Sequence, residues 1–115
     1  MGLTMKRGDI FFAALDPMHG SEIQKTRPVV IVSNDAANRA SSLVTVLPLT
    51  SNVRTVYSFE VKLTAAETGL SKDGKAMAQQ VRTIDKSRLG SVRRGVVSPE
   101  KMRLVDDALR LHLAL

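Results

Sequence analysis

Short apolar runs, rich in β-branched residues and separated by turn residues, occupy most of the chain. Such runs are typical of strands in a small sheet. Pro28 suits the first residue of one of them, because it lacks a backbone N–H and fixes its own φ. Residues 57–63 alternate with a period of two, which indicates a strand with one face in water. We predict five strands, over residues 8–15, 27–33, 43–49, 57–63 and 75–82.

Capping residues predict one long helix in the last part of the chain and short helical turns before it. Ser98 is a good N-cap, and Pro99 suits the first helical position. Apolar residues then recur at spacings of three and four and cover more than half of the helix circumference. They are Met102, Leu104, Val105, Ala108, Leu109, Leu111 and Leu115, and His112 is expected to pack on the same face. Helical turns are expected over residues 34–38, 64–69 and 85–89, where Asn, Thr and Asp can cap.

These elements predict an α+β fold in a single domain over residues 1–115. The sheet is expected to be small, strongly bent and mainly antiparallel, and to form a partly open barrel of five to seven strands. The long helix should lie across one side. No cysteine is present, which excludes disulfides and thiolate metal sites. Because the longest apolar runs are far too short to span a bilayer, we expect a soluble, cytoplasmic protein with no membrane partner.

The charge balance favours a polyanionic partner. Seventeen basic residues against eleven acidic ones give a net charge of +6. After Arg94 the charges cancel, so the whole surplus lies in the first 94 residues. Nucleic acid is the usual partner of such a surface, although many basic proteins are merely soluble. An aromatic content of only 3% argues against an extended platform on which bases stack.

The residue types restrict the chemistry. His19 and His112 lie far apart with no metal-binding motif around them, and neither a nucleophile elbow nor a Gly-rich phosphate loop is present. Any catalysis should therefore need neither metal nor cofactor, and should rely on Arg, Lys, Glu, Ser and Thr. RNA carries its own nucleophile, the 2′-hydroxyl beside each phosphate. Cleavage of RNA by that hydroxyl meets this restriction.

Three residues are the candidates for such a reaction. Arg27, held at the end of a strand by Pro28, could stabilise charge on the phosphate, and Thr50 could supply a hydroxyl to it. Glu22 could accept the proton of the 2′-hydroxyl. Each also has a simpler interpretation: Arg27 as a surface charge, Thr50 as a turn residue and Glu22 as a solvated carboxylate. His19, in a polar loop, is either a surface residue or a proton donor near the phosphate.

A second group of basic residues surrounds Arg93 and Arg94. Its other members are Arg82, Lys86 and Arg88. This group is either a patch that follows the phosphates of a nucleic acid or a solvated edge of the domain. The sequence does not decide between the two.

The chain resembles the MazF/PemK toxins along nearly its whole length. The residues that carry the resemblance are Lys6–Ile10, Asp16-Pro17, Gly20–Glu22, Arg27–Val30, Asn34-Asp35, Leu47–Ser51 and Gln79–Lys86, followed by Arg88-Leu89 and the closing helix. The resemblance implies an SH3-like barrel, which CcdB-type gyrase poisons also use, and a homodimer. It implies a metal-independent endoribonuclease that cuts single-stranded RNA at short sequences. The products would be a 2′,3′-cyclic phosphate (or a 3′-phosphate) and a 5′-hydroxyl.

The resemblance also implies roles for individual residues and a partner. Arg27 and Thr50 match the family's catalytic pair, and Glu22 matches a residue that is important in some members. Ser21, Ser51 and Gln80 match positions near the RNA, and we expect Lys25 and His19 to lie near it too. A cognate MazE-like antitoxin would block the RNA groove with an acidic tail, and contact with DNA would come only through that complex. A guanidinium scarcely loses its proton near neutral pH, so we expect Arg27 to stabilise charge and Glu22 or water to accept the first proton.

Three functions therefore follow from the sequence. The first is an mRNA-cleaving toxin of a type II toxin–antitoxin pair. The second is a CcdB-like toxin that poisons gyrase by binding it. The third is an RNA-binding module without activity, which the scarcity of aromatic residues makes the least attractive.

Overall fold

Seven strands and three helices make up the fold in the computed structural model, which describes residues 5–15 and 26–115. The strands are β1 (Asp9–Ala14), β2 (Thr26–Ile31), β3 (Leu43–Thr50), β4 (Glu60–Leu63), β5 (Gly74–Met77), β6 (Arg82–Asp85) and β7 (Gly95–Val96). The α-helices are α1 (Asp35–Ala40), α2 (Ala65–Thr68) and α3 (Pro99–Leu113), and two 3-10 turns are η1 (Ala78–Gln80) and η2 (Lys86–Arg88). The predicted α+β class is confirmed.

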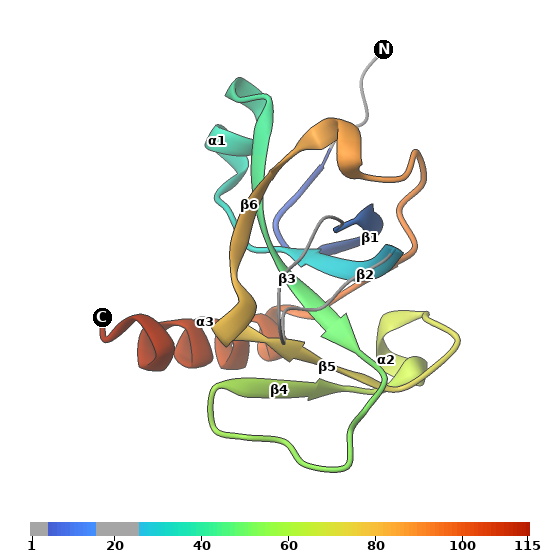
Figure 1. The fold of residues 1–115 in the computed structure, drawn as a ribbon, viewed down its shortest axis with the longest axis vertical. Coiled ribbons are helices and arrows are strands. Elements are labelled where there is room, and N and C mark those ends of the chain that lie inside the picture. Colours follow the sequence, from blue (N-terminus) through green and yellow to red (C-terminus); the bar gives the residue numbers. More distant parts are fainter. Residues whose placement is uncertain (1–4, 16–25) are drawn as a thin grey trace.

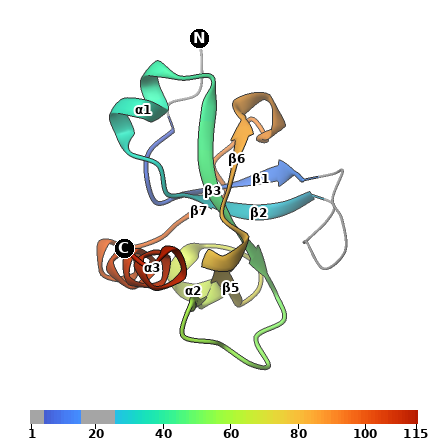
Figure 2. The same cartoon turned by 60° about the vertical axis from the view of Figure 1, so that its left-hand side comes forward.

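The sheet curls around β3, the longest strand. Its order is β4-β5-β3-β2-β1-β7, every pairing is antiparallel, and β6 pairs with β3 as well. The first part of β3 pairs with β6, whereas its last two residues pair with β5. A bridge between Ala13 and Leu89 joins β1 to the segment after β6. The sheet is therefore a half-barrel, with α3 packed against β4 and η1, toward the left in Figures 1 and 2.

Two apolar cores lie on opposite faces of β1, β2 and β3. One contains Ile10, Val30 and Leu47 together with β4, β5 and the buried side of α3. The other contains Phe11, Val29 and Val46 and lies inside the curl of the sheet. Alternate residues of each strand serve alternate cores, because successive side chains point to opposite faces. This double burial explains why these strands read as continuous apolar runs rather than as alternating ones.

The predicted helix caps are confirmed. Ser98 accepts a hydrogen bond from the backbone N–H of Lys101 at 3.2 Å, and Pro99 occupies the first turn of α3. Thr64 and Glu67 form a complete capping box at α2, which ends at Gly69. The prediction that His112 packs on the apolar face of α3 is wrong, because His112 is exposed at the end of the helix beyond the sheet. None of the helices in the described residues has the length and hydropathy that crossing a bilayer requires.

The predicted strand over residues 75–82 is wrong, since η1 divides it into β5 and β6. Leu49 pairs with Ala76, and an unbroken ladder would bring Gln79 opposite Val46. Arg82 lies opposite Val46 instead, because the 3-10 turn η1 separates the ladder of β5 with β3 from that of β6 with β3. The strand predicted over residues 57–63 is shorter than expected, since β4 begins only at Glu60.

Glu60 is buried, although the alternating pattern predicts that it faces water. The loop over residues 51–59 folds back over it, and Lys75 Nζ donates to Glu60 Oε1 at 2.8 Å and to the Thr55 carbonyl at 2.6 Å. The Tyr57 N–H and Gln79 Nε2 also donate to the Glu60 carboxylate, at 3.0 and 2.7 Å. Burial raises the pKa of Glu60, but these hydrogen bonds outweigh it, so the pKa lies below its ordinary value of 4.5.

Candidate active site

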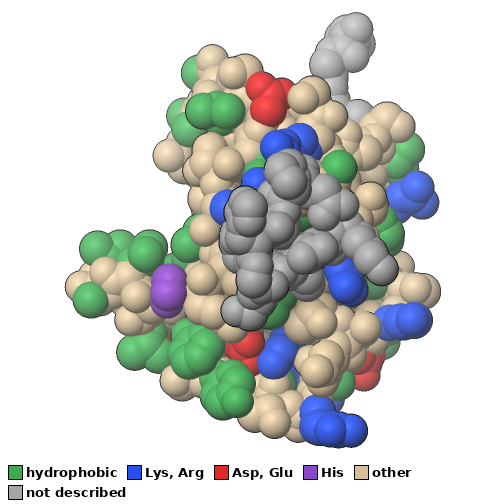
Figure 3. All heavy atoms as spheres, in the orientation of Figure 1, with side chains coloured by type: hydrophobic (Ala, Val, Ile, Leu, Met, Phe, Trp, Pro, Cys, Tyr) green, Lys and Arg blue, Asp and Glu red, His purple; other side chains and the backbone are tan. Residues whose placement is uncertain are grey.

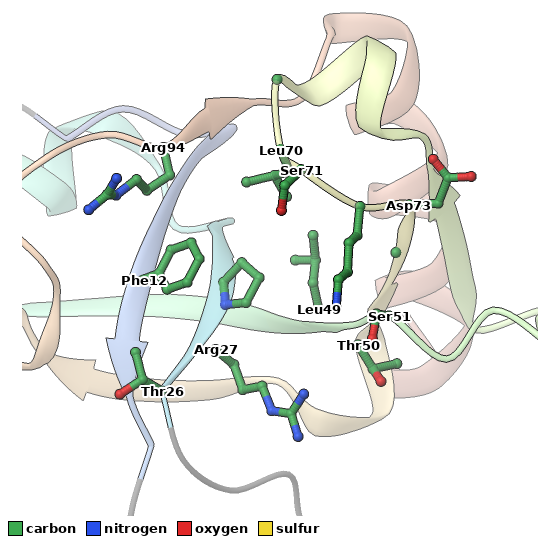
Figure 4. A pocket seen from close by; sticks show the side chains of 14 residues that line it. Phe12, Thr26, Arg27, Leu49, Thr50, Ser51, Leu70, Ser71, Asp73 and Arg94 are labelled. Atoms are coloured by element: carbon green, nitrogen blue, oxygen red, sulfur yellow. The ribbon is translucent and has the colours of Figure 1, made fainter.

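A cavity of about 440 Å³ opens at one end of β2 and β3. Arg27, Thr50 and Ser51 lie along one side of it, and Phe12, Leu70 and Arg94 lie on others (Figure 4). The segments that line it come from β1, β2, β3, the loop between α2 and β5, and the residue that precedes β7. Five segments that are distant in sequence therefore meet at this cavity.

The cavity exists because β3 changes its pairing partner. The ladder between β2 and β3 ends at Val29 and Pro48, and the next residue of β3, Leu49, pairs with β5. If the pairing of β2 with β3 continued for two more residues, Arg27 would lie opposite Thr50. Because the two strands separate there, the space between them stays open, and both side chains are half-buried at its wall.

The hydroxyl of Thr50 is oriented by the turn that follows it. Its Oγ1 accepts a hydrogen bond from the backbone N–H of Asn52 at 3.2 Å. A hydroxyl that accepts in this way keeps its own hydrogen for another acceptor, such as a phosphate oxygen. The simpler interpretation of Thr50 as a turn residue is therefore correct, and it agrees with a role at the cavity.

The charge of the cavity is positive. Arg27, Lys72 and Arg94 line it, and Asp73 is the one carboxylate among the described lining residues. Asp73 Oδ1 accepts a hydrogen bond from the backbone N–H of Ala65 at 2.7 Å, so this carboxylate already has a structural partner. Three cations against one carboxylate attract a polyanion and offer little to a divalent metal ion. The described part of the chain also contains no group of three or more His, Asp or Glu side chains that could hold a metal.

The structure brings together only some of the residues that the sequence singles out. Arg27, Thr50 and Ser51 line the same cavity, whereas Gln80 does not. Gln80 lies on η1, and its side-chain amide contacts Met77 Sδ at 3.7 Å. The four remaining candidates lie outside the described residues: His19, Ser21, Glu22 and Lys25.

The basic residues around Arg93 bond to different parts of the chain. Arg93 pairs with Asp9 at 3.5 Å, and Lys86 donates to the carbonyl of Asn38. The guanidinium groups of Arg82 and Arg88 donate to backbone carbonyls at the end of β1. Of this group only Arg94 reaches the cavity. The sequence carries no signal for this difference, nor for Phe12 at the cavity, since both depend on how β1, β2 and β7 align.

Comparisons with known proteins agree on one family. A model described as a PemK-like, MazF-like toxin of a type II toxin–antitoxin system matches residues 6–113. The endoribonuclease MazF9 of Mycobacterium tuberculosis (strain ATCC 25618 / H37Rv) is 46% identical, with 96% of this chain and 98% of the relative covered. The endoribonuclease EndoA of Bacillus subtilis (strain 168) is 37% identical, with coverages of 98% and 97%. A mycobacterial endoribonuclease solved in complex with its cognate antitoxin superimposes with a TM-score of 0.75 at 26% identity, over 97% of this chain and 95% of that one.

Proposed function

The chain belongs to the PemK-like, MazF-like family of endoribonuclease toxins of type II toxin–antitoxin systems, and from this premise we propose that it cuts single-stranded RNA without a metal ion, at the cavity that Arg27 and Thr50 line. One observation carries the proposal: the guanidinium of Arg27 and the oriented hydroxyl of Thr50 line the same cavity. The gyrase-poisoning alternative has no support in the comparisons, since the relatives named above are endoribonucleases.

The reaction uses the 2′-hydroxyl of the RNA as nucleophile. Its oxygen attacks the adjacent phosphorus, the bond to the 5′-oxygen breaks, and that oxygen takes a proton. The products are a 2′,3′-cyclic phosphate, which water can open to a 3′-phosphate, and a 5′-hydroxyl. Arg27 stabilises the charge that develops on the phosphate oxygens, and Thr50 donates its hydroxyl hydrogen to one of them. Glu22 or water accepts the first proton, and the positive cavity attracts the substrate.

A purified sample of the chain and one long single-stranded RNA test this proposal. In EDTA we expect discrete fragments with 5′-hydroxyl ends. Arg27→Ala and Thr50→Ala should each lower the rate of cutting by on the order of 100-fold or more, as the loss of one preorganised donor does. Arg54→Ala and Thr45→Ala are matched controls, because both residues lie outside the cavity. Thr45 lies on β3 itself, where its hydroxyl contacts that of Thr83 at 2.8 Å.

Each contrary result identifies a different error. Cutting that stops in EDTA and returns with magnesium refutes metal independence. Salt-sensitive RNA binding without new ends indicates the non-catalytic module. Growth arrest that persists with alanine at both Arg27 and Thr50 indicates a toxin that acts by binding protein.

The partners we propose are single-stranded RNA, a second copy of the chain and a MazE-like antitoxin. Contact with DNA would come only through the antitoxin complex. A mycobacterial relative has been solved with its cognate antitoxin, which supports this partner. For the second copy, the support is a group of exposed leucines on α3 and just after its end, where hydrophobic side chains gather in Figure 3. These leucines are Leu104, Leu111, Leu113 and Leu115.

A further inference from the structure

The cavity extends well past Arg27 and Thr50, and its other end has a different character. Phe12, Pro28, Leu49 and Leu70 form an apolar part of the wall, and Arg94 lies beyond Phe12 (Figure 4). The β ladder explains this division. Phe12 pairs with Pro28, so both side chains point to the face of the sheet opposite to that of Arg27. The cavity thus joins a polar side to an apolar one.

Phe12 is unusual among the large apolar residues of β1. Ile10 and Phe11 are fully buried, whereas 39% of Phe12 is exposed. A phenyl ring that is partly in water contributes less stabilisation than one from which water is excluded, so a ligand that covers it gains free energy. A nucleobase is a flat group that covers such a ring, and stacking on a single aromatic residue is a general mode of binding single-stranded RNA.

Arg94 is held beside this ring. Its backbone N–H donates to the carbonyl of Ile10 at 2.7 Å, and its guanidinium carbon lies 5.6 Å from the centre of the Phe12 ring. Within residues 5–15 and 26–115 no carboxylate forms an ion pair with Arg94, in contrast to its neighbour Arg93. A guanidinium in this position can bind a phosphate through its planar fork of donors while it stays over the ring.

We propose that this part of the cavity is a subsite for one nucleotide next to the scissile phosphate, with its base against Phe12 and a neighbouring phosphate on Arg94. The proposal rests on the proposed RNA cleavage. The positive charge of the cavity suits RNA, and its volume of about 440 Å³ is within the range of small-ligand sites. The few aromatic residues of the chain argue against a platform for many bases, but one exposed ring is sufficient for one base. Phe12 and Arg94 are therefore substrate-binding residues: stacking on Phe12 adds a modest preference for strongly stacking bases at one position beside the cut, and Arg94 fixes the register of the strand.

Mapping the 5′ ends of fragments from a long RNA of mixed sequence tests the subsite. Phe12→Leu keeps an apolar side chain but removes the ring, and Arg94→Ala removes the cation. Each should raise KM by on the order of tenfold, with a much smaller fall in kcat. Phe12→Leu should also relax the base preference at a single position beside the cut. Arg94→Ala should lower the slope of log KM against log salt by about 0.7, the value for one phosphate of a single strand.

Arg93→Ala is the matched control, because it removes the same charge from the adjacent residue outside the cavity. It should leave KM and the base preference unchanged. The subsite is refuted if Phe12→Leu and Arg94→Ala behave like Arg93→Ala, or if they weaken only inhibition by an antitoxin. The cleavage proposal itself fails in a different way: either the unaltered chain does not cut RNA, or Arg27→Ala cuts as well as the unaltered chain does.

Discussion

Replacing Lys75 by Met tests how the buried ion pair with Glu60 stabilises the fold. Only 2% of the Glu60 side chain and 10% of the Lys75 side chain are exposed. Met keeps most of the apolar stem of Lys75 and removes the ammonium group. The Glu60 carboxylate then keeps its bonds from Tyr57 and Gln79 but loses the opposite charge.

Breaking a buried pair by removal of one partner costs about 3–5 kcal/mol. The two remaining hydrogen bonds to Glu60 favour the lower end of that range, so we expect the free energy of unfolding to fall by about 3 kcal/mol at pH 7. For a chain of this size, such a loss lowers Tm by roughly 10 °C. Lys62→Met is the matched control, since Lys62 is exposed on β4 opposite Lys75, and it should change stability by less than about 0.5 kcal/mol.

The effect should depend on pH with a definite sign. Because the pKa of Glu60 is lowered in the folded chain, the ionised carboxylate stabilises the fold above its ordinary pKa of 4.5, and that contribution is lost as the pH falls through the lowered value. The difference between Lys75→Met and the unaltered chain should therefore be full at pH 7 and smaller near pH 4. Urea unfolding at both pH values measures it. Adding Glu60→Gln to Lys75→Met should recover at least half of the loss at pH 7.

One result would refute this reasoning. If Lys75→Met unfolds like Lys62→Met at pH 7 and shows no dependence on pH, the ion pair contributes nothing to stability.

Two further changes test the packing and the assembly. Gly95→Ala would bring a Cβ atom within 2.5 Å of the Thr68 carbonyl oxygen, so urea unfolding should show a loss of about 1–3 kcal/mol. Gly69→Ala meets no atom within 4 Å and should cost only about 1 kcal/mol, for its positive φ. Light scattering should give a mass near twice 12.5 kDa for the unaltered chain. Leu104→Lys combined with Leu111→Lys should halve that mass, and a monomeric unaltered chain would contradict the proposed dimer.

Local chemistry made most of the elements predictable. Ser98-Pro99, the capping box at Thr64 and the turn at Asn34 act over a few residues, and their helices are present where the sequence indicates them. The sequence also allows Arg27 and Thr50 to be identified as candidates, because each lies at the end of an apolar strand. Their position at one cavity was not, since it requires the register between β2 and β3.

The errors arise where tertiary contacts override a local pattern. The alternation around Glu60 cannot distinguish a face in water from a face that a loop covers. No Gly or Pro marks the break at Ala78–Gln80, which follows from the pairing of two strands with different parts of β3. Phe12 is apolar and lies within the strand predicted over residues 8–15, a pattern that does not distinguish it from a core residue, but the ladder carries it to the rim of the cavity.

β3 takes part in both halves of the half-barrel, because it pairs with β6 over its first part, with β2 in its middle and with β5 over its last two residues. Fluctuations that detach β5 leave β3 attached to β2 and β6, and fluctuations that detach β6 leave it attached to β2 and β5. The amide hydrogen of Val46, which pairs with both β2 and β6, should therefore be among the slowest of the chain to exchange with solvent. Thr50 lies outside this doubly paired part, because only β5 pairs with it, so a local opening of β5 would already release the hydroxyl on which catalysis is proposed to depend.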